Sequence, residues 1–516
     1  MKMVKSLILG SAAGLVAMSG AQAADLPVKA KAVEYVRVCS LYGAGFFFIP
    51  GTDTCIKLGG YMRIDTTFNG GIYDQPAWSG DLGVGNRYRN DFASRSRMAL
   101  TVDTRTATEY GVVRTFLQGD FQFDTLGSNT TNPAVLTAAG VNNSLLSTVG
   151  GGYVAVEFAF VQFAGFTFGK SASAYASPWH GYPGNNSSFL IGGHDTVTGV
   201  NNIQYTAQFG NGVSATIGLD DPTVFNRTSI YNLSIPTAVS AAGTSSNVYA
   251  GVNMPDIVGN IRIDQAWGLF QLSGAIHEVD ASYNSLSAGG VPTGLSGISG
   301  HPETKYGGSV MAALQIKNIP TGPGDDIKID ATWAKGDTKN VISTSATSPT
   351  FTMFGGAGAG AYQSIGFGAT TDAVYLPAFA GGDGSLHLTT AFGVRGAFNH
   401  NWDPYWSSSL FGSYSGVRYD GVAKANICAV YTAARVTAPS ADYSCNPDYN
   451  VAQIGVVTRW TPVKNLTFSA EVMYFALDQK FTGSAILGPT APKPVARYDF
   501  KDQDTVALNV RVQRNF

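Results

Sequence analysis

The chain has 516 residues, of which 62 are glycine and only 13% are charged, and its formal net charge is −2. Globular proteins carry about 25% charged residues, so this chain is charge-poor. Its 12% aromatic content excludes a disordered chain, which would be short of aromatic residues and rich in charge. The near-zero charge gives no general attraction to nucleic acid. Only one apolar stretch approaches the roughly 20 residues that a transmembrane helix needs. After these classes are excluded, a large, β-rich, exported protein is the expected class.

Residues 1–23 are predicted to be a cleaved signal peptide. Two lysines precede an apolar core over residues 7–18, and Ala21-Gln22-Ala23 has the small-x-small pattern that signal peptidase recognises. The alternative is a membrane anchor, but the apolar core is too short to span a bilayer. The mature chain is therefore expected to begin at Ala24.

Four cysteines form two close pairs in the sequence. Fifteen residues separate Cys39 from Cys55, and sixteen separate Cys428 from Cys445. In an exported chain such pairs predict two local disulfides, because nearest-neighbour pairing closes the shortest loops. The alternative is a metal site, but the usual C-x-x-C spacing and nearby histidine pair are absent from the sequence.

Apolar and polar residues alternate in many segments after the signal peptide. In segment 56–68, for example, Leu58, Met62 and Ile64 share one parity, whereas Arg63 and Asp65 share the other. This alternation is typical of strands with one apolar face. Some segments, such as 406–416, alternate poorly. Together they predict about 16 strands. The predicted strands begin near residues 56, 92, 109, 152, 166, 199, 213, 257, 269, 305, 326, 386, 405, 450, 465 and 502.

Short and long connections alternate along most of the chain. Short turns are expected around residues 164–165, 210–212, 267–268, 401–404 and 461–464. Long loops are expected at roughly 125–150, 171–198, 221–256, 278–304, 337–385, 417–449 and 478–501. In an up-and-down antiparallel barrel, this order places all the turns at one end and all the loops at the other.

The number of strands indicates where such a barrel sits. About eight strands fill a barrel with their own side chains, whereas 16 to 18 leave an aqueous interior. The apolar face is then satisfied only when it points outward into lipid and the polar face lines water. Aromatic residues near the predicted turns suit an interfacial girdle, namely Trp267, Trp402, Tyr405, Trp406, Trp460 and Phe516. A soluble sandwich also alternates and is the alternative at this point.

Two segments resemble a known family. Residues 32–39 (AVEYVRVC) and 42–61 (YGAGFFFIPGTDTCIKLGGY) look like the N-terminal signature of alphaproteobacterial general porins. Residues 510–516 (VRVQRNF) resemble the last strand of outer-membrane proteins, whose final Phe, here Phe516, is read by the assembly machinery. The resemblance implies an all-β, 16-stranded antiparallel transmembrane β-barrel that forms homotrimers in the bacterial outer membrane. It also implies short periplasmic turns, long extracellular loops and a third loop folded into the lumen.

Strand parity predicts a basic wall inside this barrel. The residues expected on it are Lys57, Arg63, Arg95, Arg97, Arg114, Arg459 and Arg511. They lie on the first three strands and on late strands, the last of which must close onto the first. A basic wall in a narrow passage would generate a field that biases ion passage. Acidic residues are also expected inside, among them Asp65, Asp120, Glu157 and Glu471. The alternative is that these charges pair with one another and only keep the lumen wet.

Segment 171–198 follows the fifth predicted strand and is expected to be the constriction loop. The resemblance implies acidic residues on this loop, facing the basic wall. The sequence offers only Asp195 there, together with His180 and His194. A strong transverse field is therefore not expected, and the sign of any ion selectivity is left open.

No catalytic or cofactor-binding motif occurs in the sequence. A G-x-S-x-G nucleophile elbow and an H-E-x-x-H zinc motif are both absent. The glycine-rich run 355–360 lacks the preceding strand and following helix that a phosphate-binding loop needs. We expect no catalytic residue, metal or cofactor.

These observations predict three parts: a signal peptide (1–23), a pre-barrel segment (24–55) and a transmembrane β-barrel (56–516). The expected function is that of a porin, a water-filled channel for passive diffusion of small hydrophilic solutes and ions. Its expected surroundings are outer-membrane lipid, and no nucleic acid is expected as a partner. The alternatives are a substrate-specific channel and a secreted β-rich adhesin or carbohydrate-binding protein.

Overall fold

The computed structural model describes most of the chain after residue 36. The described residues are 37–70, 91–124, 152–185, 190–195, 198–224, 226–235, 247–342, 351–355, 363–489 and 493–516. The predicted signal peptide and residues 24–36 of the predicted pre-barrel segment lie outside them. No described helix is long and apolar enough to cross a membrane.

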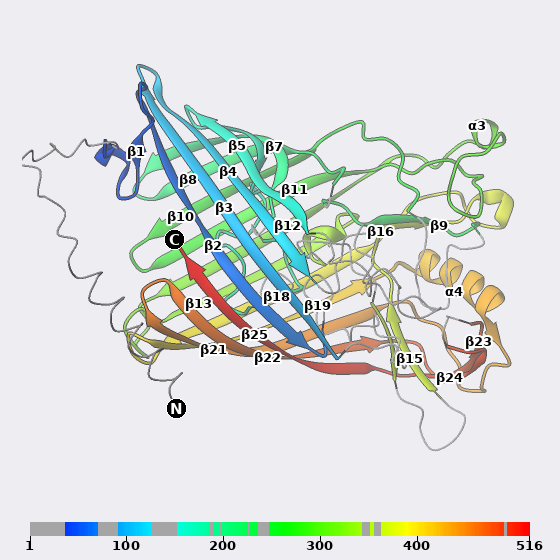
Figure 1. The fold of residues 1–516 in the computed structure, drawn as a ribbon. Helices are drawn as coiled ribbons and strands as arrows, with labels where there is room; N and C mark the ends of the chain where they lie inside the picture. The colour runs from blue at the N-terminus through cyan, green and yellow to red at the C-terminus, as the bar shows by residue number, and fades with distance from the viewer. Residues whose placement is uncertain are drawn as a thin grey trace, which may run out of the picture.

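Sixteen antiparallel strands form one closed sheet (Figure 1). Each strand pairs with the next in the series, and the last strand pairs with the first, so the sheet has no open edge. The predicted 16-stranded barrel is thus confirmed, and every strand begins within four residues of its predicted start. The strands are β2 (Thr54–Phe68), β3 (Phe92–Thr108), β4 (Gly111–Asp124), β5 (Tyr153–Phe163), β6 (Phe166–Ser171), β7 (Val200–Gly210), β8 (Val213–Asp220), β10 (Asp256–Gln265), β11 (Gly268–Val279), β12 (Lys305–Lys317), β13 (Asp326–Lys335), β18 (Thr390–Asn401), β19 (Trp406–Arg418), β21 (Tyr449–Val463), β22 (Leu466–Gln479) and β25 (Gln503–Asn515).

Alternate residues of each strand point to opposite sides of the barrel wall. On β2, Leu58 and Ile64 are 52% and 53% exposed on the outside, whereas Asp65 and Thr67 are buried inside. Every one of the sixteen strands carries exposed large apolar side chains. The outer face of the barrel is therefore apolar, as expected for contact with lipid.

The segment before the barrel folds against the start of β2. It contains the short helix η1 (Ser40–Tyr42) and β1 (Phe47–Phe48), which pairs with β2. The disulfide between Cys39 and Cys55 joins this segment to β2, so the first predicted disulfide is confirmed.

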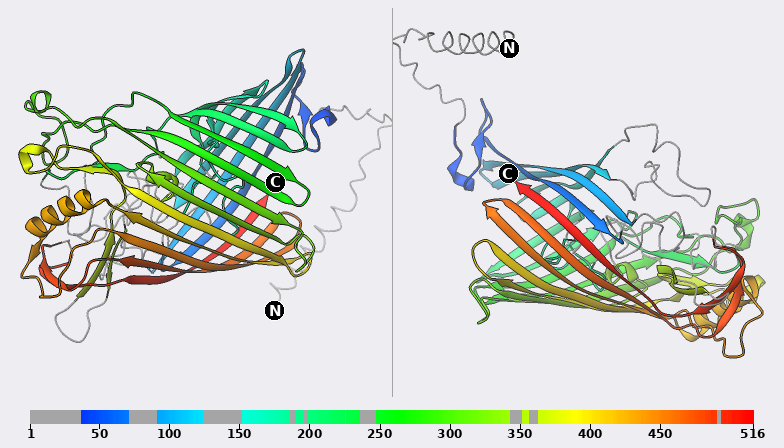
Figure 2. Two further views of the ribbon diagram at one scale, coloured as in Figure 1. Left: turned by 180° about the vertical axis from the view of Figure 1, so that it is seen from behind. Right: turned by 60° about the horizontal axis from the view of Figure 1, so that its bottom comes forward.

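The short turns and the long connections lie at opposite ends of the barrel (Figures 1 and 2). The C-terminus and β1 lie at the turn end. The turn between β5 and β6 consists of Ala164 and Gly165, whose φ angles of 49° and 87° are both positive. A two-residue hairpin with this backbone matches the twist of the strands that it joins.

The long connections fold into further structure, which the sequence analysis did not predict because it treated them as loops. One five-stranded sheet and one three-stranded sheet form at this end of the barrel, together with helix α4 (Gly421–Arg435). We call these elements the cap. Its strands are β14 (Phe351–Gly355), β15 (Gln363–Gly368), β24 (Ala496–Phe500), β23 (Ser484–Leu487) and β20 (Val436–Thr437), and β17 (His387–Leu388), β16 (Thr371–Tyr375) and β9 (Ser229–Asn232). Shorter helices in the long connections are α3 (Ser296–Ser299), η3 (Thr338–Asn340) and η4 (Ala378–Ala380).

Helix α4 packs one face onto the cap. The Asp420 side chain accepts a hydrogen bond of 2.8 Å from the backbone N–H of Ala423 and so caps the first turn. Ala423, Ile427 and Tyr431 are four residues apart, and this spacing places them on one buried face. The disulfide between Cys428 and Cys445 ties the helix to the following loop, so the second predicted disulfide is also confirmed.

The lipid-facing assignment of the outer wall can be tested at Val456, which is 46% exposed near the middle of β21. We expect Val456→Arg to destabilise the barrel by about 2–4 kcal/mol, because an arginine on the lipid face would lie in hydrocarbon. Equilibrium unfolding in phospholipid vesicles measures this change. The control Val456→Leu should change the unfolding free energy by less than about 1.5 kcal/mol. Equal stability of the two variants would contradict the assignment.

Candidate pore constriction

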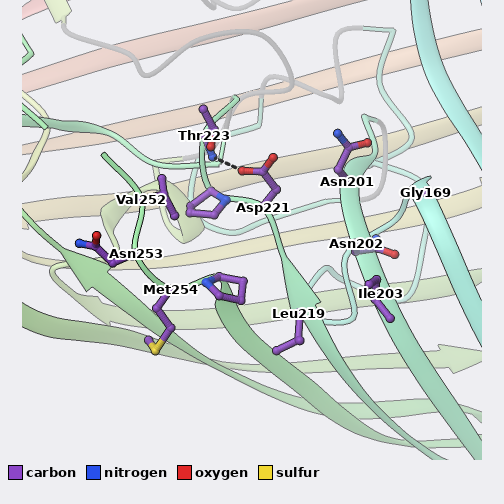
Figure 3. A pocket seen from close by; sticks show the side chains of 12 residues that line it. Gly169, Asn201, Asn202, Ile203, Leu219, Asp221, Thr223, Val252, Asn253 and Met254 are labelled. Carbon is purple, nitrogen blue, oxygen red and sulfur yellow. Dashed lines mark hydrogen bonds between the residues drawn. The ribbon is translucent and has the colours of Figure 1, made fainter. Parts of the chain in front are cut away.

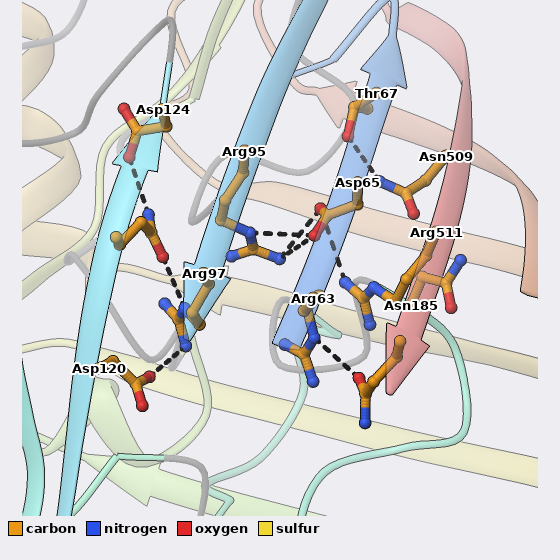
Figure 4. A network of polar contacts seen from close by, with 12 residues as sticks. Arg63, Asp65, Thr67, Arg95, Arg97, Asp120, Asp124, Asn185, Asn509 and Arg511 are labelled. Atoms are coloured by element: carbon orange, nitrogen blue, oxygen red, sulfur yellow. Dashed lines mark hydrogen bonds and ion pairs between the residues drawn. The ribbon is translucent and has the colours of Figure 1, made fainter. Parts of the chain in front are cut away.

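A row of charged residues crosses the inner wall where the barrel closes (Figure 4). Strand register places Arg95 of β3 opposite Asp65 of β2, and Asp65 opposite Arg511 of β25. The row continues through Ser469 of β22 to Arg459 of β21. Closure of the barrel thus brings together charged residues from the two ends of the chain.

Two of the predicted wall arginines form ion pairs with predicted inner acids. Arg95 donates from Nε and Nη2 to the two carboxylate oxygens of Asp65 at 3.1 and 3.0 Å. Nη1 of Arg97 lies 2.5 Å from Oδ2 of Asp120 and 3.8 Å from Oε1 of Glu157. All five side chains lie on the inner side of the wall, where a buried charge is costly unless it is paired.

Three other predicted arginines have weaker or neutral partners. Arg63 Nε donates to the Gln513 side chain at 2.9 Å, and Arg459 Nη1 donates to the Ser409 hydroxyl at 2.9 Å. Nη2 of Arg511 lies 3.7 Å from Oδ1 of Asp65, beyond hydrogen-bond distance. Positive charge on this part of the wall is therefore only partly neutralised.

The two remaining predicted basic residues lie away from this row, toward the turn end. Arg114 forms an ion pair of 3.0 Å with Asp103, and Lys57 is exposed, with Nζ 5.8 Å from the centre of the Phe46 ring. Asp103 also pairs with Arg105 at 3.0 Å. The sequence analysis missed Arg105, although its parity is that of Arg95, Arg97 and Asp103.

The connection between β6 and β7 lies inside the barrel. We call residues 172–185 and 190–195 of this connection the inner segment. Polar side chains of the wall hold its backbone: Asn260 donates to the Ala174 carbonyl at 2.6 Å, and Gln271 donates to the Ala176 carbonyl at 2.8 Å. Further along, the Ile191 N–H donates to the Gln453 side chain at 2.8 Å. The inner segment therefore follows the inner face of the wall from β10 to β21.

Apolar side chains also fix the inner segment. Trp179, Tyr182 and Leu190 are buried in a cluster with Phe411 of β19 and Val457 of β21. Phe411 and Val457 point into the barrel, on the face that the sequence pattern assigned to polar residues. Segment 406–416 alternates poorly for this reason, because one of its inward residues packs against the inner segment.

Arg395 of β18 is the main polar anchor of the inner segment. Its Nε and Nη2 each donate at 3.0 Å to a carboxylate oxygen of Asp330, its cross-strand neighbour on β13. Nη2 also donates to the His194 carbonyl at 3.0 Å, and the Tyr182 hydroxyl donates to Asp330 at 2.6 Å. A Cβ atom added at Gly193 would lie 2.6 Å from Oδ1 of Asp330, so only glycine allows this approach. Alternation along β13 and β18 gives Asp330 and Arg395 the parity of inward residues, but alternation alone does not pair them.

The three residues predicted for the constriction loop have separate surroundings. His180 is exposed, and Asp195 lies 3.8 Å from Nη1 of Arg395. Nδ1 of His194 lies 2.9 Å from the Asn340 amide oxygen, and burial lowers the pKa of this histidine to about 4. His194 is therefore neutral at pH 7. Together the three residues provide little negative charge to face the basic wall.

The inner segment meets the charged row beside Glu471 of β22. The backbone N–H of Asn185 donates to Oε2 of Glu471, and the Ser469 hydroxyl donates to the Asn185 amide oxygen at 2.9 Å. A Cβ atom added at Gly184 would lie 2.6 Å from Oε2 of Glu471. Asn185, which the sequence analysis did not single out, thus lies next to the cross-strand partner of Arg511.

At the loop end, Asp372 of β16 holds several connections together. It accepts hydrogen bonds from the backbone N–H groups of Thr228 and Thr338 at 2.9 and 2.7 Å and from the Tyr249 hydroxyl at 2.9 Å. Asp372 is fully buried. This network joins cap strand β16 to the segments before β9 and after β13.

A pocket of about 520 Å³ lies on the outside of the barrel, near the loop end of β7 and β8 (Figure 3). Its lining includes Ile203 and Leu219, whose side chains are exposed on the outer face, and Met254 from the connection before β10. The pocket therefore lies outside the lumen. Among the described residues, no group of three or more His, Cys, Asp and Glu side chains is arranged to hold a metal ion.

A closed 16-stranded barrel with an apolar outside, a charged inside and a segment folded into its lumen defines a porin-type β-barrel. The chain belongs to the Porin subfamily, whose sequence profile matches residues 25–509. Family membership and the barrel fold support an outer-membrane location.

Individual relatives agree with this family. The chain is 34% identical over 277 residues to porin Omp2b of Brucella suis biovar 1 (strain 1330) and, to the same extent, to that of Brucella abortus (strain 2308). Each match covers 51% of this chain and 63% of the relative. The fold is similar to the outer membrane channel DcaP of Acinetobacter baumannii, with a TM-score of 0.55 and 15% identity over 91% of this chain and 99% of that chain.

The anchoring role of Arg395 can be tested by Arg395→Ala. We expect a loss of about 3–5 kcal/mol of stability, because Asp330 would remain buried without its charged partner. We also expect a larger and noisier single-channel current, because the inner segment would lose contacts at His194 and Asp195. Equilibrium unfolding and planar-bilayer recording measure the two effects.

The milder variant Tyr182→Phe removes one hydrogen bond to Asp330 and keeps the ion pair. It should cost about 1 kcal/mol and leave the conductance near the wild-type value. If Arg395→Ala changed neither stability nor current, Arg395 would not be the anchor.

Proposed function

We propose that this protein is a passive, water-filled porin through which small hydrophilic solutes and ions diffuse down their gradients. The observation that carries the proposal is the closed barrel with an apolar outer face and a row of buried charges around the inner segment. Lipid is a favourable environment for the apolar outer face, and water is a favourable environment for the charged row. The channel spares polar solutes the crossing of the hydrocarbon layer and performs no covalent chemistry.

The proposed path follows the side of the lumen formed by β2, β3, β4, β5 and β25. The inner segment is bonded to the wall between β10 and β22, and the cap core is packed against the ends of β21, β22 and neighbouring strands. The charged row then lines the remaining side. Because Arg95 and Arg97 are already paired with acids, we propose weak to moderate ion selectivity.

We further propose that residues 1–23 are removed on export and that the mature chain assembles as a homotrimer with the help of the outer-membrane assembly machinery. The position of Phe516 supports its part as an assembly signal. Its side chain is 56% exposed, and its backbone exchanges hydrogen bonds of 3.1 and 3.3 Å with Gly60. The terminal residue thus lies at the seam where β25 meets β2, the last joint of a closing barrel.

Planar-bilayer recording tests the channel. The purified, detergent-folded protein should insert in steps and conduct KCl in proportion to its concentration. Graded polyethylene glycols should reduce the conductance only below a size limit set by the constriction. Migration of a heat-modifiable trimer on gels would support the oligomeric proposal.

Three other outcomes would redirect the assignment. A protein that stays soluble without detergent and gives no current would be a secreted adhesin or carbohydrate-binding protein. A membrane-inserted protein with no conductance would refute the open channel. A channel that conducts one solute with saturation, is inhibited by it and does not conduct KCl in proportion to its concentration would indicate a substrate-specific channel.

A further inference from the structure

We propose that Arg511 is a binding site for the carboxylate group of small anionic solutes at the constriction. The proposal rests on the function proposed above and adds a ligand class to it. The evidence is a comparison of what the Nε and Nη2 atoms contact in Arg511 and in the other arginines of the lumen. These two atoms lie on one edge of the guanidinium group. This edge matches the two oxygens of a carboxylate in geometry and charge.

Four other arginines inside this barrel use the same edge to hold a carboxylate. Arg95 holds Asp65 at 3.1 and 3.0 Å, and Arg395 holds Asp330 at 3.0 and 3.0 Å. Arg105 and Arg114 both hold Asp103, at 3.2 and 3.0 Å and at 3.1 and 3.0 Å. The lumen is therefore an environment in which this edge of arginine takes up carboxylates.

Arg511 presents the same edge without a ligand. It is 8% exposed, and among the described residues neither Nε nor Nη2 has a hydrogen-bond partner. Oδ1 of Asp65 lies 3.7 Å from Nη2, and both carboxylate oxygens of Asp65 are already bonded to Arg95. A buried guanidinium edge without a partner is unfavourable, so a ligand that supplied two oxygens would bind with a favourable free energy.

Neighbouring groups add further donors. The Nδ2 group of Asn185 is also buried without a hydrogen-bond partner among the described residues. Its amide oxygen accepts from Ser469, which is directly opposite Arg511 across the β22–β25 pair. Arg63 is a diagonal neighbour of Arg511 on β2, and its Nε donates to the neutral Gln513 side chain. Arg511, Arg63 and Asn185 thus bring N–H groups to the same part of the inner wall (Figure 4).

Two acids limit this site. Glu471 is a diagonal neighbour of Arg511 on β22, and its Oε2 is bonded to the backbone N–H of Asn185. Asp65 lies on the other side and remains with Arg95. These acids would repel a dianion, which favours a monocarboxylate. The Nε and Nη2 atoms of Arg511 are shielded from solvent, so a neighbouring side chain must move for the carboxylate to enter.

Single-channel recording in potassium acetate, with potassium chloride as the reference salt, tests the site. Acetate has the two coplanar carboxylate oxygens that match the Nε and Nη2 atoms of arginine, whereas chloride is a single spherical ion. The wild-type acetate current should saturate with concentration, while the chloride current should not. Arg511→Lys keeps the positive charge but removes the paired Nε and Nη2 donors, whereas Arg511→Gln removes both the charge and this pair of donors.

Both variants should raise the half-saturating acetate concentration by about ten-fold, the effect expected for loss of a charge-assisted hydrogen bond. The matched control is Arg114→Gln, which removes a lumen arginine but leaves Asp103 paired with Arg105. It should keep the wild-type saturation. Heat-modifiable migration checks that each variant is folded.

The outcomes separate this site from the channel itself. A saturating acetate current that survives in Arg511→Lys would overturn the proposal, because charge alone would then suffice. A linear wild-type acetate current beside normal chloride conductance would overturn the site and leave the channel standing. Absence of current in chloride would overturn the proposed function and the site with it.

Discussion

The hydrogen bonding of β25 to β2 is the constraint on which the rest of this structure depends. A wall that faces hydrocarbon must satisfy every backbone N–H and C=O group within itself, and only a closed sheet does so. Closure also fixes the register between the two ends of the chain, from Tyr61 opposite Asn515 to Phe68 opposite Leu508. Because side chains alternate strictly, a shift of one residue at this seam would turn either Asp65 or Arg511 toward lipid. The seam therefore sets both the stability of the wall and the chemistry of the lumen.

The interior of the barrel is divided between two kinds of surface. Toward β19, β21 and β22, inward apolar residues such as Phe411, Val457 and Met473 pack against the inner segment. Near the loop end, Val451, Phe475 and Leu477 join a large core shared with the cap. On the side of β2, β3 and β25 the inward residues include the charged row, with Asp65, Arg95 and Arg511. A barrel of this width would otherwise hold water throughout, so in the proposed channel the packed chain on one side would confine the aqueous path to the other.

Most charged residues of the lumen form ion pairs that stabilise the structure. Ion pairs such as Arg95 with Asp65 and Arg395 with Asp330 are buried, and removal of either partner would leave a charge in a region of low dielectric constant. Paired charges also cancel at a distance and so produce a weaker field across the pore. In the proposed channel, Arg63 and Arg459, which have neutral partners, and Arg511 would remain to act on passing ions.

The sequence by itself determined the number of strands, their parity, the order of turns and loops, and both disulfides. These features depend on near neighbours in the sequence. Alternation reports the strands directly, and the paired cysteines are only 16 and 17 residues apart. Only the tertiary structure decided the cap, because residues 337–385 and 417–449 show no long alternation and gain their order from a shared core. It also decided the pairing of Arg395 with Asp330, since the register across the long β13–β18 connection is not encoded locally. The packing of Phe411 beneath the inner segment reverses the polarity that alternation assigns to an inward residue, because contact with a distant segment outweighs the local pattern.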